Sequence, residues 1–218
     1  MKPPVRIIYE DDHLIVIYKA AGIPVQTASV AKTDVCSYLK NHLKGGYLGV
    51  VHRLDQPVEG LLVFAKDKDT AADLSAQLSS GELKKSYRAV VYGKGPASGT
   101  DVCFMKKTSD NLSVIGEGED YKRTELSFEL METYDRASEY RINIQTGRFH
   151  QIRSQMAHLG LPILGDMKYG TPDSIEYSKE KKITVPALCA DELEFMDRSI
   201  NEVSKFYVVP ENPTFAVL

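Results

Sequence analysis

Residues 50–65 read VVHRLDQPVEGLLVFA, in which a polar turn separates two apolar segments. The segments 50–52 and 61–65 have the composition of buried strands, and the turn between them carries Arg53 and Asp55. Side chains on such a turn lie at the rim of a rigid sheet, where reactive groups are disproportionately found. A carboxylate at position 55, beside an arginine, stays ionised and is suited to act as a nucleophile or base. Spacing alone favours the alternative, a surface pair in which Asp55 only caps the turn and Arg53 pairs with it.

On both sides of this stretch the sequence alternates short apolar segments with turn residues. We expect strands over residues 6–10, 13–18, 50–52, 61–65, 87–92, 126–134, 140–144, 188–195 and 206–209. We expect helices over residues 33–43, over 69–80, and along the stripe Phe149, Ile152, Met156 and Leu159. Residues 100–123 are irregular and predict an insertion or a mobile hairpin. Many hairpin-length strands with few helices predict an α+β fold, a single domain over residues 1–218 built on a mixed, largely antiparallel β-sheet with flanking helices.

Capping residues set the expected helix boundaries. Thr33 or Asp34 begins the first helix, Asp69 the second and Thr146 the third, because side-chain oxygens of these residue types accept from free amides of the first turn. The free amides after Thr146 would also make a seat for a phosphate group.

Composition limits the classes of protein. The chain has 218 residues with 43% hydrophobic and 26% charged residues, which is typical of a globular protein. No apolar stretch is long enough to span a bilayer, and no signal segment follows the N-terminal charges, so we expect a cytoplasmic protein without a membrane partner. Three cysteines without a CxxC pair predict neither disulfides nor a metal site. With 27 basic and 30 acidic residues, the net charge of −3 argues against a broad, sequence-independent nucleic-acid surface.

Two further places are candidates for chemistry. His150 and Arg153 lie three residues apart on the third helix and can face one site, although a solvated helix face is the alternative. Tyr87, in a strand, could stack on a planar ligand or simply pack in the core. A glycosidase pair of Asp55 and Glu59 is disfavoured because the chain has no tryptophan. No histidine or cysteine spacing matches a zinc site.

Together these segments resemble the RluA-like family of pseudouridine synthases, which modify ribosomal and transfer RNA. Five motifs follow one another in the family's order. They are residues 8–16 with 19–22, residues 52–55 with 60–66, residues 85–89 with Gly93, residues 146–153 with 157–160, 165–166 and 169–170, and a closing strand with Leu188, Ala190, Leu193 and Phe195. The resemblance covers nearly the whole chain.

The resemblance implies a pseudouridine synthase catalytic domain that isomerises uridine to pseudouridine in rRNA or tRNA, by base flipping and without a cofactor or metal. It gives Asp55 the role of catalytic carboxylate, which attacks the base or assists its loss from the sugar. It makes Arg153 the partner of Asp55 and places Tyr87 against the flipped uracil. The residues it implies for RNA binding are Arg53, His52, Lys85, Arg148 and His150. We expect a monomer with RNA as its partner.

Three departures from the family pattern stand out. Val58 and Glu59 replace the usual Thr-Ser, which predicts an altered rim beside Asp55. Cys189 stands where a histidine or similar polar residue is common, and we expect no N-terminal S4 domain. The change at Val58 and Glu59 motivates an alternative function, a non-catalytic RNA-binding relative that keeps the fold.

Overall fold

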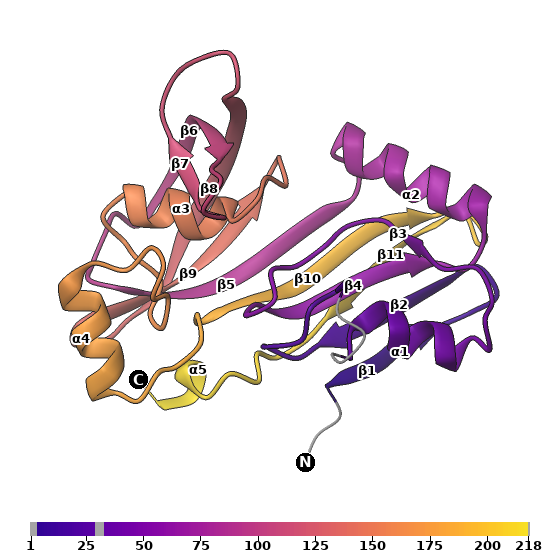
Figure 1. The fold of residues 1–218 in the computed structure, drawn as a ribbon, viewed down its shortest axis with the longest axis horizontal. Coiled ribbons are helices and arrows are strands. Elements are labelled where there is room, and N and C mark those ends of the chain that lie inside the picture. The colour runs from indigo at the N-terminus through magenta and orange to yellow at the C-terminus, as the bar shows by residue number, and fades with distance from the viewer. Residues whose placement is uncertain (1–3, 29–32, 218) are drawn as a thin grey trace. The chain divides into compact units, whose positions relative to one another are not determined.

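The computed structural model describes residues 4–28 and 33–217. Figure 1 labels its helices and strands. In chain order they are β1 (Val5–Glu10), β2 (Leu14–Lys19), α1 (Val35–His42), β3 (Gly49–Val50), β4 (Glu59–Ala65), α2 (Lys68–Ser80), β5 (Lys84–Tyr92), β6 (Ser98–Lys107), β7 (Ser113–Ile115), β8 (Lys122–Thr133), β9 (Ala137–Ile144), α3 (Gln151–His158), α4 (Pro172–Glu180), β10 (Leu188–Asp197), β11 (Glu202–Tyr207) and α5 (Thr214–Val217).

The chain divides into two compact units, each made of two stretches of sequence. The first unit comprises Met1–Lys85 and Ala190–Glu211, and the second comprises Ser86–Cys189 and Asn212–Leu218. Strands β5 and β10 each run from one unit into the other. The single domain expected over residues 1–218 stays a prediction.

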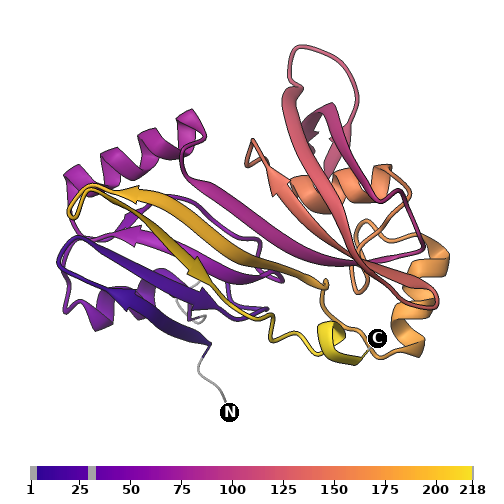
Figure 2. The same ribbon diagram turned by 180° about the vertical axis from the view of Figure 1, so that it is seen from behind.

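The sheet of the first unit has the order β1-β2-β4-β10, with β3 also paired to β4 and β11 to β10. Four of these pairings are antiparallel: β1 with β2, β2 with β4, β3 with β4, and β10 with β11. Figure 2 shows β11 running beside β10 from behind. Helix α2 packs against β3 and β4, and His42 of α1 contacts Glu10 of β1, with Nε2 and Oε2 2.7 Å apart. The predicted strands on either side of the Asp55 turn are confirmed, although the first is only two residues long.

The core of this unit explains why the Asp55 turn has a rigid base. Every residue of β2 and β4 is buried, and alternate apolar residues of these strands pack with Leu74 of α2 and Phe195 of β10. Gly60 has a φ of +129°, and a Cβ atom there would lie 2.3 Å from the carbonyl oxygen of Ala190. Only glycine fits this contact, so the first residues of β4 and β10 meet backbone to backbone.

The second unit contains a sheet of order β5-β9-β8-β6-β7, antiparallel throughout. The segment 100–123, expected to be an insertion or mobile hairpin, forms the ordered strands β6 and β7 and the start of β8. The hairpin is fixed to α3, because the Ser154 hydroxyl donates to the Ser113 carbonyl at 3.1 Å and Gln155 Nε2 donates to Asp101 Oδ2 at 2.6 Å. The segment is therefore a paired hairpin, as one of the two expectations had it, with hydrogen bonds to α3 at Ser113 and Asp101.

Helix boundaries correct three sequence expectations. Helix α1 begins after Asp34, as predicted, but α2 is capped by Asp67 instead of Asp69. Helix α3 is capped by His150 in a left-handed conformation, whereas the Thr146 hydroxyl donates to Gln151 Oε1 at 2.8 Å. Helix α4 was not predicted at all.

The predicted fold class is confirmed. Helices flank sheets that contain antiparallel pairings such as β2 with β4 and β5 with β9, as expected of an α+β protein. Within residues 4–28 and 33–217, no helix combines the length and the apolar character that crossing a bilayer requires.

Candidate active site

Asp55 lies in the first unit, on the turn that joins β3 to β4. Leu54 and Val58 on either side of it are buried, while Asp55 itself is partly exposed. The Val58 amide donates to the Asp55 carbonyl at 3.0 Å and closes the turn. The turn is also joined to the loop after β2, because the Gly22 amide donates to the Gln56 carbonyl at 2.8 Å. The backbone that carries the carboxylate is therefore fixed on both sides.

A buried lysine lies beneath this turn. Lys19 has no exposed surface, and its Nζ donates to the carbonyl oxygens of Ala20 at 3.2 Å, Ile23 at 2.8 Å and Gln56 at 3.1 Å. Burial lowers the pKa of Lys19 to about 8, and the nearby charge of Asp55 partly opposes that shift. The sequence interpretation placed Lys19 only within a motif and missed this contact.

Glu59 and Val58, the departures from the family pattern, are buried. Their exposed fractions are 3% and 2%. The sequence suggested that they alter the rim beside Asp55, but the structure buries both side chains. Glu59 Oε2 accepts from the Tyr18 hydroxyl at 2.6 Å, and Oε1 accepts from the Glu211 amide at 3.1 Å. The added carboxylate is thus hydrogen-bonded on both oxygens, as a buried polar group must be.

The predicted RNA-binding residues of the first unit differ in exposure. Arg53 is exposed, whereas His52 is buried and its Nε2 accepts from the Val63 amide at 3.2 Å. Burial, with a smaller effect from the Lys85 charge, holds the pKa of His52 well below its usual value, so the ring is neutral at pH 7. Lys85 is partly buried, and burial lowers its pKa to about 8. Arg53 is therefore the most accessible cation of this group.

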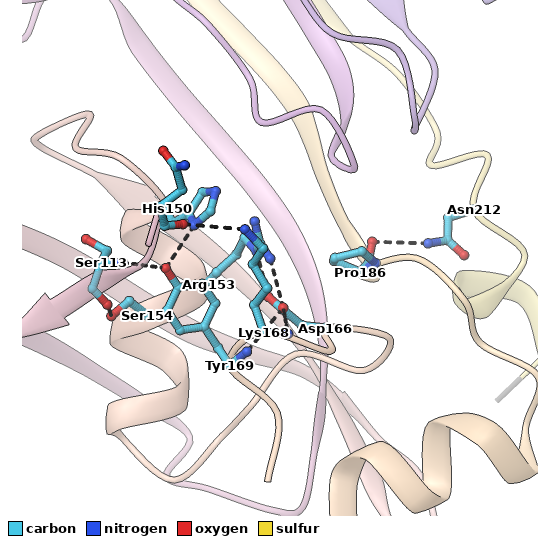
Figure 3. Close-up of polar contacts among 10 residues, drawn as sticks. Ser113, His150, Arg153, Ser154, Asp166, Lys168, Tyr169, Pro186 and Asn212 are labelled. Atoms are coloured by element: carbon cyan, nitrogen blue, oxygen red, sulfur yellow. Dashed lines mark hydrogen bonds and ion pairs between the residues drawn. The ribbon is translucent and has the colours of Figure 1, made fainter. Parts of the chain in front are cut away.

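Arg153 lies in the second unit and has a buried carboxylate partner there. Its Nε and Nη2 donate to the two oxygens of Asp166 at 2.6 Å and 2.8 Å, and both side chains are almost completely buried. Asp166 Oδ1 also accepts from the amides of Lys168 at 3.0 Å and Tyr169 at 3.3 Å. Figure 3 shows Asp166 between these amides and the guanidinium. The predicted pairing of Arg153 with Asp55, which lies in the other unit, stays a prediction.

His150 and Arg153 lie near each other, although His150 precedes α3 in a left-handed conformation and does not share a helix face with Arg153 as their spacing predicted. Both lie around Tyr169, whose ring centroid is 5.2 Å from the Arg153 guanidinium carbon and whose hydroxyl is 2.8 Å from His150 Nδ1 (Figure 3). The same hydroxyl accepts from the Ser113 amide at 2.7 Å. Tyr169 thus connects the loop after α3 to α3 itself and to the β6–β7 hairpin. The sequence interpretation included Tyr169 in a motif but gave it no role.

The remaining predicted residues occupy contrasting positions in the second unit. Tyr87 is 5% exposed in β5, opposite Ile142 of β9. Arg148 is exposed just before α3, where its amide donates to Gln151 Oε1 at 3.1 Å. Among the described residues, no group of three or more histidine, cysteine, aspartate or glutamate side chains could hold a metal ion.

A model of the RNA pseudouridylate synthase family matches residues 13–158, a stretch that contains Asp55, Tyr87 and Arg153. The chain belongs to this family. It is 33% identical over 198 residues to an uncharacterized RNA pseudouridine synthase of Chlorobaculum parvum, covering 83% of this chain and 61% of the relative. It is 31% identical over 179 residues to the ribosomal large subunit pseudouridine synthase D of Zymomonas mobilis, covering 77% and 56%. The resemblance to RluA-like synthases is confirmed.

Solved structures agree with the fold of this family member. Human RNA pseudouridylate synthase domain containing 1 superposes with a TM-score of 0.80 at 19% identity, covering 98% of this chain and 89% of the other. Human RNA pseudouridylate synthase domain containing 4 gives 0.77 at 21%, covering 94% and 89%. At these identities the likeness shows the fold alone. The chain spans about 61% and 56% of the length of the two bacterial relatives.

Proposed function

We propose that this chain isomerises specific uridines to pseudouridine in structured RNA, ribosomal or transfer, with Asp55 as the catalytic carboxylate. The main support for the proposal is the position of Asp55. It is partly exposed on a hydrogen-bonded turn that leads directly into β4, a strand whose residues are all buried. The family relationship supports the reaction class. A carboxylate held in this way can meet a reacting atom without first reorganising its surroundings.

The proposed reaction needs neither oxidant nor reductant. The N1–C1′ bond of uridine breaks, C5 bonds to C1′, the proton leaves C5, and N1 gains a proton, so product and substrate are isomers. The uracil must leave its stack to be reached. Tyr87 stacks on the flipped base and assists removal of the C5 proton, while Arg153 pairs with the Asp55 carboxylate and keeps it ionised. No cofactor enters this scheme.

The proposed RNA contacts are phosphate contacts by Arg53, Lys85, Arg148 and His150, with Arg53 supporting the flipped state. For His52 we propose a supporting role beneath Arg53, because its buried ring is bonded to the β4 backbone. The alternative of a non-catalytic RNA-binding relative was motivated by Val58 and Glu59, and both of these side chains are buried.

The decisive experiment maps pseudouridines in total RNA from cells with and without this protein. We expect one or a few positions in rRNA or tRNA to lose pseudouridine when the protein is absent. Purified protein should then restore those positions in transcripts made without modification. Identical maps from both cells, together with no conversion in vitro, would contradict the proposal and favour the binding-only alternative.

The Tyr87 side chain offers a test of its two interpretations. As a packing residue, Tyr87→Phe should be harmless and Tyr87→Leu should cost at most about 1.5 kcal/mol of stability. As a stacking residue whose hydroxyl assists proton removal, Tyr87→Phe should keep RNA binding and lose turnover, because only the ring remains. Tyr87→Leu should also weaken binding, since stacking contributes about 1–3 kcal/mol per base.

The assay for these variants is single-turnover release of tritium from C5 of labelled uridine, beside a binding titration. The exposed Tyr47→Phe is the matched control. Full activity of Tyr87→Phe would eliminate the hydroxyl's role and leave stacking. Full activity of both variants would return Tyr87 to a purely structural role.

RNA affinity should depend only moderately on salt. The cations that we propose for phosphates are few: Arg53, Arg148 and Lys168 are exposed, Lys85 is partly buried, and Lys84 already pairs with Glu194 at 3.0 Å. Binding titrations at several salt concentrations should give a log–log slope of about −2 to −4, at roughly 0.7 to 0.9 per phosphate contact. A slope steeper than about −7 would require a far larger basic surface and contradict this expectation.

A further inference from the structure

Tyr169 contacts three parts of the second unit that are far from it in sequence or structure. Its hydroxyl accepts from the Ser113 amide of β7 at 2.7 Å and lies 2.8 Å from Nδ1 of His150. Because a phenolic oxygen can accept one hydrogen bond while its own proton donates another, both contacts can be made at once. The Arg153 guanidinium lies over the ring, with its carbon 5.2 Å from the centroid (Figure 3). One side chain thus joins the hairpin, the start of α3 and the arginine proposed for catalysis.

A second series of contacts runs from His150 back to the same hairpin. The His150 ring stacks on the Phe149 ring with 3.8 Å between centroids, and Nζ of Lys107 lies 4.6 Å from the Phe149 centroid. Lys107, the last residue of β6, and Ser113, the first of β7, are direct partners in the hairpin. The contacts therefore close a circle. Tyr169 binds one member of this strand pair through its amide, and Phe149 binds the other through its ammonium group.

The loop after α3 holds the backbone of Tyr169. The Tyr169 amide donates to Asp166 Oδ1 at 3.3 Å, and both oxygens of the same carboxylate bind Arg153, at 2.6 Å and 2.8 Å. Lys168 of this loop donates to the Asn111 carbonyl in the turn of the hairpin at 3.4 Å. Asp166 and Tyr169 thus both contact Arg153, and the loop that carries them also contacts the hairpin.

The hydroxyl of Tyr169 determines where its ring can lie. Ser113 and His150 are buried, so the groups that the hydroxyl contacts have little access to water. A buried amide that loses its partner is costly, which keeps the hydroxyl in its place. Arg153 is buried too, and the attraction between a guanidinium and an aromatic face is stronger away from water. A ring anchored at its hydroxyl therefore gives the guanidinium one fixed surface to lie on.

We infer that Tyr169 is a positioning residue, which fixes the Arg153 guanidinium and ties its place to the end of the β6–β7 hairpin. The inference rests on the proposed function for the importance of Arg153. Tyr169 acts through Arg153 and has no proposed contact with the reacting base. A change at the end of the hairpin should therefore reach the reaction rate through Tyr169, even where it leaves RNA affinity unaltered.

The first experiment compares Tyr169→Phe with Tyr140→Phe as matched control. Tyr140 is completely buried in β9, and its hydroxyl donates to the Pro96 carbonyl at 3.1 Å, so each variant loses one hydrogen-bonded hydroxyl. Single-turnover tritium release, with protein in saturating excess over RNA, should be about tenfold slower for Tyr169→Phe. This is less than the roughly hundredfold cost of a 1 Å misplacement, because the ring under Arg153 remains. RNA affinity should not change, and Tyr140→Phe should keep the parent rate.

A second measurement follows Arg153 directly and requires no activity. Its Nε donates to Asp166 Oδ2 at 2.6 Å in a buried site, so this N–H group is protected and observable by NMR spectroscopy of nitrogen-labelled protein. Tyr169→Phe should shift or broaden its resonance, because the ring beneath the guanidinium is no longer anchored. Hydrogen exchange at the Ser113 amide should become faster. Tyr140→Phe should leave both signals unchanged.

The third experiment tests the connection to the hairpin with two neighbouring lysines. Lys107→Met removes the cation over Phe149, whereas the control Lys106→Met removes a cation that lies over Tyr121, 4.7 Å from its centroid and outside the circle. At saturating protein, Lys107→Met should slow tritium release severalfold and Lys106→Met should not. Adding Lys107→Met to Tyr169→Phe should have little further effect, because the circle is already open.

Each outcome decides the inference. A rate for Tyr169→Phe within about twofold of the parent, or equal losses in Tyr169→Phe and Tyr140→Phe, would overturn it. An unchanged Arg153 resonance, or independent effects of Tyr169→Phe and Lys107→Met on the rate, would do the same. A parent chain that releases no tritium from any RNA would instead overturn the proposed function. The Arg153 resonance and the Ser113 exchange would then still decide whether Tyr169 fixes the guanidinium.

Discussion

Asp55→Asn should reduce pseudouridine formation by at least about a thousandfold, which corresponds to roughly 4 kcal/mol of activation free energy. An amide matches the carboxylate in size but cannot act as a nucleophile or base in its place. The turn should keep its shape, because the Val58 amide donates to the backbone carbonyl of residue 55 and Lys19 Nζ donates to that of Gln56. The measurement is single-turnover tritium release, with circular dichroism and RNA titration to show that the fold and affinity persist.

The matched control for this substitution is Asp12→Asn, an exposed carboxylate in the same unit. It should retain the rate of the parent. Asp55→Asn activity within about tenfold of the parent, roughly 1.4 kcal/mol, would show that the carboxylate does not take part in bond making or breaking. The catalytic group would then have to be sought elsewhere on the chain.

The buried pair of Arg153 and Asp166 should give the largest effect on stability. Asp166→Asn or Arg153→Met leaves one charge buried without its ion-pair partner, which typically costs about 3–5 kcal/mol. In the double variant neither charge remains, so its loss of stability should be clearly smaller than the sum of the two single losses. Urea unfolding monitored by circular dichroism measures each free energy of unfolding.

The control cycle uses Arg123→Met and Glu125→Gln, a solvent-accessible pair in the same unit whose side chains are 55% and 30% accessible. Exposed pairs contribute about 0–1 kcal/mol, so these changes should be small. Additive losses in the Arg153–Asp166 cycle would mean that the two side chains stabilise the second unit independently.

Local sequence patterns predicted much of the fold. The apolar segments around the Asp55 turn appear as β3 and β4, and Asp34 caps α1 as its residue type suggested. The cap of α2 shows the limit of this reasoning. Asp67 and Asp69 both have capping side chains, and only the extended backbone at Asp67, with its carboxylate accepting from the Thr70 amide, decides between them.

Helix α4 shows a different limit. It has the signals of a helix start, with Thr171 as cap and Pro172 in the first turn, but few of its residues are apolar. The search for an apolar stripe therefore passed over it. Its buried side chains are Ser174, Tyr177 and Ser178, and two of them are polar.

The sequence predicted the site residues that lie in motifs, but it did not predict the contacts that those residues make with distant parts of the chain. Asp55, Tyr87 and Arg153 were named from the sequence, but nothing in the spacing of Arg153 and Asp166 predicts a bidentate pair. Lys19 follows an apolar strand in the manner of an exposed end residue. Its burial depends on the Gln56 carbonyl, which the folded chain brings from 37 positions away.

The division of each unit into two stretches of sequence has a consequence for biosynthesis. A ribosome makes β1 to β4 first, then nearly all of the second unit, and only afterwards the segment Ala190–Glu211 that completes the first. Until that segment emerges, Gly60 lacks the neighbouring Ala190 backbone and Glu59 lacks the Glu211 amide. The support for Asp55 therefore stays unfinished on the nascent chain while residues 86–189 of the second unit are made, and it can be completed only when Ala190–Glu211 follows them.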